Sequence, residues 1–113
     1  MSPVILELVK GPNTDNSVYD EIARLGEDVL GKGIVHAKDT PNFIGNRIGV
    51  YGMAVTMNTA IEHGLTVEEV DKLTGTVVGR PKSATFRTAD VVGLDTMINV
   101  SNTSYNNLDD DEE

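Results

Sequence analysis

Apolar and polar positions divide the first forty residues into three predicted elements. Residues 4–10 form an almost continuous apolar run, which is typical of a strand buried on both faces. Residues 16–31 place apolar side chains every three or four positions, which predicts an amphipathic helix that either Thr14 or Asp15 can cap. Residues 34–37 predict a second short strand. A β-α-β unit of this size has unpaired strand edges and only half a core by itself.

The rest of the chain has a helical pattern. Residues 43–64 predict one helix that is apolar over more than half of its circumference and therefore buried on several sides. Thr66 and Glu69 have the spacing of a capping box at the start of a short helix. Residues 84–100 predict a last helix. A small helical unit with this much apolar surface is expected to bind a second copy of the chain.

The segment 38–47 joins the two patterns. Thr40 and Asn42 can accept hydrogen bonds from the first N–H groups of the long helix, and Pro41 suits a first helical turn. Three glycines lie within that predicted helix, at Gly45, Gly49 and Gly52. Each costs about 1 kcal/mol relative to alanine in a helix interior, so they indicate close approach by another backbone or a ligand.

Composition excludes several classes of protein. With 113 residues the chain forms at most one ordinary domain, and without cysteine it has neither a disulfide framework nor a thiolate zinc site. No apolar run approaches the roughly 20 residues that span a bilayer. The net charge is −9, with no basic stripe and few aromatic residues, so we expect no nucleic-acid partner. A cytoplasmic protein without a membrane partner is the expectation.

Both ends of the sequence suggest a piece of a longer polypeptide. Met1 and Ser2 resemble an added start. The last five residues are acidic and follow a helical pattern that has no stop signal. We therefore expect a fragment that ends in a polar, disordered tail.

The joining segment resembles a known family. Residues 38–47 read K-D-T-P-N-F-I-G-N-R, which resembles at eight of ten positions the K-D-T-P-G-F-I-x-N-R signature of the L-3-hydroxyacyl-CoA dehydrogenases of fatty-acid β-oxidation. Residues 6–14 and 90–95 agree with the same family in order and spacing. The resemblance covers residues 4 to 100, nearly the whole chain.

The resemblance implies a mostly α fold in three parts. Residues 1–41 would be the C-terminal edge of a Rossmann-type NAD-binding domain, a short β-α-β remnant. Residues 42–101 would be the all-helical C-terminal and dimerisation domain, and residues 102–113 the acidic tail. The loop at 79–87 departs from the commonest family pattern and resembles the bacterial and archaeal multidomain forms, in which an enoyl-CoA hydratase domain can follow.

The resemblance assigns roles to two residues. Glu7 matches the glutamate that orients the catalytic histidine, although a strand position that faces solvent would also explain it. Asn46 matches the asparagine that hydrogen-bonds near the reacting 3-hydroxyl or ketone and positions the substrate beside the nicotinamide. Arg47 and Lys38 are better explained as an ion-pair partner and a strand-end lysine. Asn42 and Gly45 depart from the family pattern, which leaves the acyl-chain length open.

The family's histidine lies about a dozen residues before the glutamate, which is upstream of Met1 here. We expect His36 to face the first helix and His63 to lie at a helix C-terminus, so neither matches it. The G-x-G-x-x-G fingerprint is also absent, so NAD would be bound mainly by an upstream domain. No His/Cys cluster predicts a metal.

We therefore expect part of an NAD-dependent enzyme that oxidises 3-hydroxyacyl-CoA to 3-ketoacyl-CoA, inactive as this fragment alone. The expected partners are the acyl-CoA substrate and a second copy of the chain, which could exchange strands or helices with the first. One alternative is a non-catalytic helical dimerisation module on the same scaffold. Another is a related β-hydroxyacid dehydrogenase that does not use coenzyme A.

Overall fold

The computed structural model describes residues 4–109. The chain divides into two compact units between Gly45 and Asn46. The domain limits expected from the sequence, at residues 41 and 101, stay a prediction.

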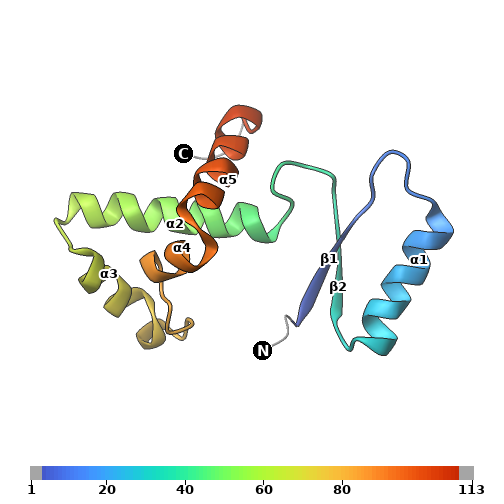
Figure 1. Cartoon of the computed structure of the whole chain (residues 1–113), viewed down its shortest axis with the longest axis horizontal. Coiled ribbons are helices and arrows are strands. Elements are labelled where there is room, and N and C mark those ends of the chain that lie inside the picture. Colours follow the sequence, from blue (N-terminus) through green and yellow to red (C-terminus); the bar gives the residue numbers. More distant parts are fainter. Residues whose placement is uncertain (1–3, 110–113) are drawn as a thin grey trace. The chain divides into compact units, whose positions relative to one another are not determined.

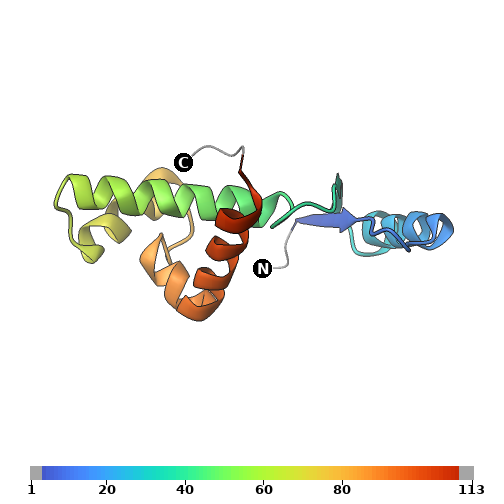
Figure 2. The ribbon, with the colours of Figure 1, turned by 90° about the horizontal axis from the view of Figure 1, so that it is seen from above.

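The first unit contains two parallel strands joined by a helix. β1 (Ile5–Val9) pairs in register with β2 (Gly33–Ala37). Between them the chain forms α1 (Asn16–Arg24), which continues into a π-helical turn at residues 25–29. Figures 1 and 2 show α1 beside the two strands. The predicted β-α-β unit is therefore confirmed.

Local residue types explain how α1 begins and how its continuation packs. Asp15 is the N-cap, and its carboxylate accepts hydrogen bonds from the N–H groups of Ser17 and Val18. The side-chain and backbone hydrogen bonds from Ser17 hold the pKa of Asp15 below its usual range. Gly26 is buried, and a Cβ there would lie 2.6 Å from Ile34. The missing side chain at Gly26 lets the π-helical turn approach the strands.

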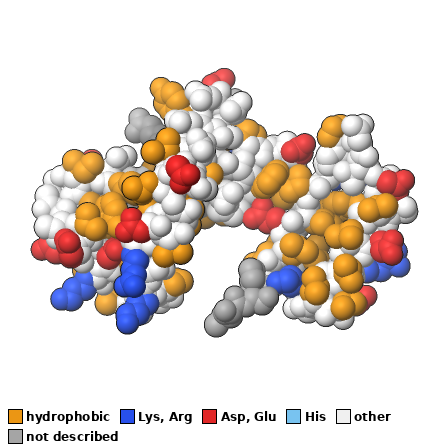
Figure 3. Space-filling view, in the orientation of Figure 1, with side chains coloured by type: hydrophobic (Ala, Val, Ile, Leu, Met, Phe, Trp, Pro, Cys, Tyr) orange, Lys and Arg blue, Asp and Glu red, His pale blue; other side chains and the backbone are white. Residues whose placement is uncertain are grey.

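The first unit does not bury its apolar surface. The expectation that β1 is buried on both faces is wrong for this chain, because Ile5 is 58% exposed and the other four residues of β1 are only partly buried. Figure 3 shows hydrophobic side chains gathered on the visible face of this unit. A two-stranded pair with one helix has too few neighbours to cover both faces.

The second unit is entirely helical among its described residues. Its main helices are α2 (Gly45–Glu62, whose first residue belongs to the first unit), α3 (Val67–Thr74), α4 (Phe86–Val92) and α5 (Leu94–Asn107), with a 3₁₀ turn at residues 76–78. Ala60, Val70 and Ala89 are buried and come from α2, α3 and α4 in turn. The long helix predicted at 43–64 is confirmed with shifted ends. Its predicted burial on several sides is wrong, because only Ala60 of α2 is buried.

Two carboxylates organise the helix starts of this unit. Thr66 and Glu69 form the predicted capping box, and the Thr66 N–H holds the pKa of Glu69 below its usual range. Asp71 accepts hydrogen bonds from the N–H groups of Thr85 (3.1 Å), Phe86 (2.6 Å) and Arg87 (3.0 Å), where α4 begins. Asp71 therefore anchors the start of α4 to α3.

The predicted single helix at 84–100 is wrong. Gly93 has φ 98° and ψ 128°, which interrupts the helix and separates α4 from α5. The predicted tail is also wrong in part, because residues 102–107 continue α5. The last four residues lie outside the described part. Asn, Ser and Thr side chains have only weakly unfavourable helix propensity, so a polar composition does not by itself end a helix.

Candidate active site

The carboxylate of Glu7 binds the backbone at the start of α2. Its Oε2 accepts a hydrogen bond from the N–H of Ile44 at 3.1 Å, and its Oε1 accepts one from the N–H of Gly45 at 2.6 Å. Glu7 is half-buried in the middle of β1. A carboxylate within a strand needs such partners, and the first N–H groups of a helix lack partners within the helix and carry partial positive charge.

The residues before α2 shape this contact. Asn42 (φ 61°) and Phe43 (φ 50°) both adopt the left-handed conformation immediately before Ile44 and Gly45. Asparagine enters this region more readily than other side chains, which explains how it can stand where the family has glycine. The same conformation is unfavourable for phenylalanine, so the surrounding contacts must hold it. The expected acceptors Thr40 and Asn42 were thus the wrong choice for these two N–H groups.

Asn46 is the second residue of α2, whereas the helix predicted from residue 43 would place it about one turn in. Its side chain is exposed and has no hydrogen-bond partner within residues 4–109. An exposed amide at this place can donate to one group and accept from another. The catalytic roles that the resemblance assigns to Glu7 and Asn46 stay a prediction.

His36 is turned away from Glu7. Glu7 lies opposite Val35 in the strand pair, and successive side chains of a strand point to opposite faces, so His36 points to the other face. There its Nδ1 lies 2.7 Å from the Tyr19 hydroxyl, on α1. The prediction that His36 faces the first helix is confirmed. His63 follows the last residue of α2, as expected.

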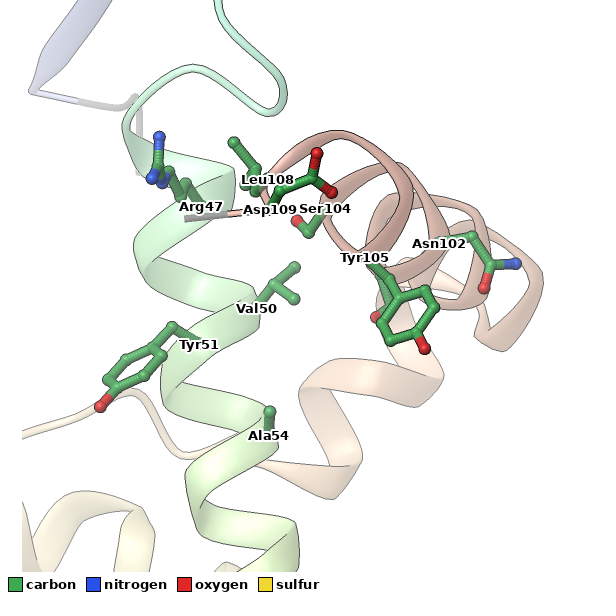
Figure 4. Close-up of a pocket in the computed structure, with 10 residues that line it drawn as sticks. Arg47, Val50, Tyr51, Ala54, Asn102, Ser104, Tyr105, Leu108 and Asp109 are labelled. Atoms are coloured by element: carbon green, nitrogen blue, oxygen red, sulfur yellow. The ribbon is translucent and has the colours of Figure 1, made fainter. Parts of the chain in front are cut away.

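A separate groove lies along α2 and α5 in the second unit, with a volume of about 900 Å³. Figure 4 shows Val50 pointing from α2 toward α5, with Ser104 and Tyr105 on the α5 side. Both apolar and polar side chains line the groove: Arg47, Val50, Tyr51, Ala54, Ser101, Asn102, Ser104, Tyr105, Leu108 and Asp109. Sequence periodicity did not identify this groove, because the prediction ended the last helix too early.

Residues 4–109 hold no group of three or more His, Cys, Asp or Glu side chains placed to bind a metal ion. In the same range, no helix combines the length and the apolar character needed to cross a membrane.

Residues 43–113 match the family described as "3-hydroxyacyl-CoA dehydrogenase, C-terminal domain". The chain belongs to the 3-hydroxyacyl-CoA dehydrogenase family, as the resemblance of residues 38–47 indicated. The mostly α fold with a small β-α-β part is likewise confirmed.

Curated relatives and a solved structure agree with this assignment. The chain is 53% identical to a probable 3-hydroxyacyl-CoA dehydrogenase of Bacillus subtilis over 96% of its own length and 14% of the relative's. It is 45% identical to a protein of the same name from Deinococcus radiodurans, covering 96% of the chain and 32% of the relative. The structure of (S)-3-hydroxybutyryl-CoA dehydrogenase PaaH1 from Ralstonia eutropha matches with a TM-score of 0.80 at 27% identity, covering 96% of this chain and 38% of that one. The chain thus spans a third or less of these two curated relatives.

Proposed function

We propose that this sequence forms part of an NAD-dependent enzyme that oxidises 3-hydroxyacyl-CoA to 3-ketoacyl-CoA in fatty-acid β-oxidation. The observation that carries the proposal is the Glu7 carboxylate bound to the N–H groups of Ile44 and Gly45, directly before Asn46. The next residue, Asn46, has an exposed amide without a hydrogen-bond partner among residues 4–109, so that amide is available to a substrate.

Glu7 would orient the catalytic base. An ionised carboxylate has about four acceptor positions on its two oxygens, and the two N–H groups use one on each oxygen. The remaining positions can accept the N–H of a histidine from the segment that precedes this sequence. That histidine would take the proton of the substrate 3-hydroxyl, and Glu7 would stabilise the imidazolium that forms.

Asn46 would position the substrate. Its neutral amide can donate a hydrogen bond to the oxygen at C3 as the hydroxyl becomes a ketone, without a change of its own charge. NAD, when bound, accepts the hydride from C3. The present sequence lacks the glycine-rich phosphate-binding fingerprint, so residues outside it would hold NAD, and the 113-residue chain alone would be inactive.

Two features support a larger assembly. The uncovered apolar side chains of the first unit suit further strands and helices of an NAD-binding domain. The groove between α2 and α5 suits a second copy of the chain, which makes a homodimer our proposal for the second unit. The low coverage of the Bacillus subtilis relative supports a multidomain parent, of the kind that carries an enoyl-CoA hydratase domain.

The test is an Asn46→Ala substitution in the native full-length polypeptide. We expect acetoacetyl-CoA reduction by NADH to fall about a hundredfold, because the amide would contact the reacting oxygen. Asn58→Ala is the matched control, since Asn58 is also an exposed asparagine of α2. Its activity should equal that of the wild type.

Three results would contradict the proposal. A wild-type polypeptide without dehydrogenase activity would overturn the function itself. Unchanged activity in Asn46→Ala, with the oligomer intact, would favour the non-catalytic dimerisation module. Turnover by the 113-residue chain alone would show that NAD binding does not need residues outside it.

A further inference from the structure

The chain makes a tight turn immediately before α2. The Phe43 N–H donates a hydrogen bond to the Thr40 carbonyl at 3.0 Å, so Pro41 and Asn42 are the two central residues of a four-residue turn. Proline at the second position and a positive φ at the third are the features of a type II turn, in which glycine or asparagine is preferred at the third position. Asn42 has φ 61°. The residue types of this turn therefore match its backbone conformation.

The turn leads directly to the two donors of the Glu7 contact. Phe43, with φ 50°, is followed by Ile44 and Gly45. Their N–H groups donate to Oε2 and Oε1 of Glu7 at 3.1 Å and 2.6 Å. Because each peptide group is planar, the backbone dihedrals of the preceding residues decide where these N–H groups point. Two adjacent N–H groups bound to different oxygens then define the plane of the carboxylate.

We propose that Asn42 is a positioning residue for the reaction, because it holds the left-handed conformation that turns the N–H groups of Ile44 and Gly45 toward the Glu7 carboxylate. This inference rests on the proposed function, in which Glu7 orients the catalytic histidine. Most side chains are unfavourable in the left-handed conformation, whereas glycine and asparagine tolerate it best. Asn42 therefore makes this turn with less strain than another side chain would bring.

Space at Gly45 does not account for the position of the carboxylate. A Cβ built on Gly45 would lie 2.5 Å from Oε1 of Glu7, but this oxygen ends a flexible side chain that can move aside. A Cβ built on Gly49 or Gly52 meets no described atom within 4 Å, so the close approach predicted from these two glycines is wrong within this chain. The direction of the two N–H groups is what fixes the carboxylate.

A fixed carboxylate is what a catalytic histidine needs as a partner. When two N–H groups hold Glu7, its remaining acceptor positions point in defined directions. A histidine bound there has one orientation, as a general base requires. If residue 42 left the left-handed region, the two N–H groups would point elsewhere and the carboxylate would lose its defined position.

Substitutions at residue 42 give a graded test of this conformation. Glycine enters the left-handed region freely, asparagine readily, alanine with difficulty and β-branched valine least of all. Asn42→Gly should therefore keep the contact with Glu7, Asn42→Ala should weaken it and Asn42→Val should break it. Asn13→Val is the matched control, because Asn13 is an exposed asparagine in another turn of the first unit and is not among the residues with positive φ.

The contact itself can be tested in the 113-residue chain by ¹H–¹⁵N NMR. As the pH is lowered through the range in which carboxylates take up a proton, the amide proton signals of Ile44 and Gly45 should move together. The movement should be absent in Glu7→Gln and in Asn42→Val, and it should persist in Asn42→Gly. Independent behaviour of the two amides in the wild type, or unchanged movement in Asn42→Val, would overturn the inference.

The consequence for catalysis is measured in the native full-length polypeptide. We expect Asn42→Val to lower kcat about tenfold or more and to leave KM for the acyl-CoA within about twofold, because Asn42 acts through Glu7 and the histidine. Asn42→Ala should lie between this variant and the wild type, and both Asn42→Gly and Asn13→Val should keep kcat within about twofold of the wild type.

The pH profile distinguishes positioning from a role in folding alone. In Asn42→Val we expect the acidic limb of the oxidation rate to move to lower pH, since an imidazolium without a fixed carboxylate loses its proton more easily. Asn42→Gly should restore the position of the limb. A loss of folded protein would lower the rate at every pH and would leave the limb where it is.

The outcomes separate this inference from the function on which it rests. Wild-type kinetics in Asn42→Val and Asn42→Ala, together with a loss of activity in Asn46→Ala, would overturn the positioning role and leave the dehydrogenase intact. Equal losses in Asn42→Gly and Asn42→Val would assign the effect to the amide side chain and would also overturn the inference. No activity in the wild type would overturn the function and the catalytic consequence, and the NMR measurement would still decide the contact. If the valine variant does not fold, the alanine variant gives the same comparison.

Discussion

Glu7 and Asp71 have the same kind of role in different units. Each carboxylate accepts hydrogen bonds from consecutive backbone N–H groups where a helix starts, and each belongs to another element. Ordinary caps come from residues within the first turn, such as Asp15 and Thr66. A cap from a distant residue joins two elements and satisfies the free N–H groups in one contact.

The anchor at Asp71 predicts a loss of stability on substitution. Asp71→Ala should lower the free energy of unfolding by about 2 kcal/mol, because three N–H groups lose their acceptor. Urea denaturation followed by circular dichroism measures the change. Asp90→Ala, at an exposed position of α4, is the control and should stay within about 0.5 kcal/mol of the wild type. Equal stability of the two variants would show that water can replace the Asp71 hydrogen bonds with no change in the free energy of unfolding.

At the scale of elements, the α4–α5 junction decides the shape of the second unit's C-terminal half. Apolar side chains keep helical spacing through Gly93, so periodicity alone predicts one continuous helix. The positive φ of Gly93 ends α4 and starts α5 in a new direction. This break lets the second half of α5, together with Leu108 and Asp109 after it, line the groove with α2.

The junction makes a second stability prediction. A Gly93→Ala variant should lose about 1–3 kcal/mol, because a side chain is unfavourable at φ 98° and its Cβ would lie 2.7 Å from Oδ1 of Asp95. Gly49→Ala should instead gain about 0.4–1 kcal/mol, since the helix conformation suits alanine and the site is open. Denaturant midpoints of the two variants compare them directly. If the Gly93→Ala variant is as stable as the wild type, a single helix running through residue 93 has the same stability as α4 and α5 separated at Gly93.

At the scale of the whole molecule, neither unit encloses much of its apolar surface. Few side chains are buried, and Ile48 (67%), Ile98 (60%) and Tyr105 (86%) are among the exposed hydrophobic residues of the second unit. Soluble monomers rarely expose this much without a partner. The proposed NAD-binding domain and second copy would cover these surfaces.

The proposed homodimer predicts the effect of a charge in the groove. Ala54→Arg should convert a dimer of the 113-residue chain to a monomer in light scattering, because a buried unpaired charge is costly at an interface. Thr59→Glu is the control and should stay dimeric, because Thr59 is exposed and lies about 140° around α2 from Ala54 at about 100° per residue. A dimer that survives Ala54→Arg would place the contact elsewhere, for example at the strands of the first unit.

The sequence by itself determined the local elements and the family. The β-α-β pattern, the long helix, the cap at Thr66 and the signature at 38–47 all depend on residues a few positions apart, so they can be recognised without a fold. For the first helix the sequence left Thr14 and Asp15 as alternative caps, and the structure selects Asp15.

Only the tertiary structure decided which groups Glu7 and Asp71 bind and where α4 ends. The partners of Glu7 lie 37 and 38 residues away, and those of Asp71 lie 14 to 16 residues away. Glu7 looked like a lone carboxylate, and Gly45 like one of three equivalent helix glycines. Hydrogen bonds and steric contacts depend on the distance between atoms in space. When two residues are separated by more than a few helical turns along the chain, their spacing in the sequence does not predict that distance.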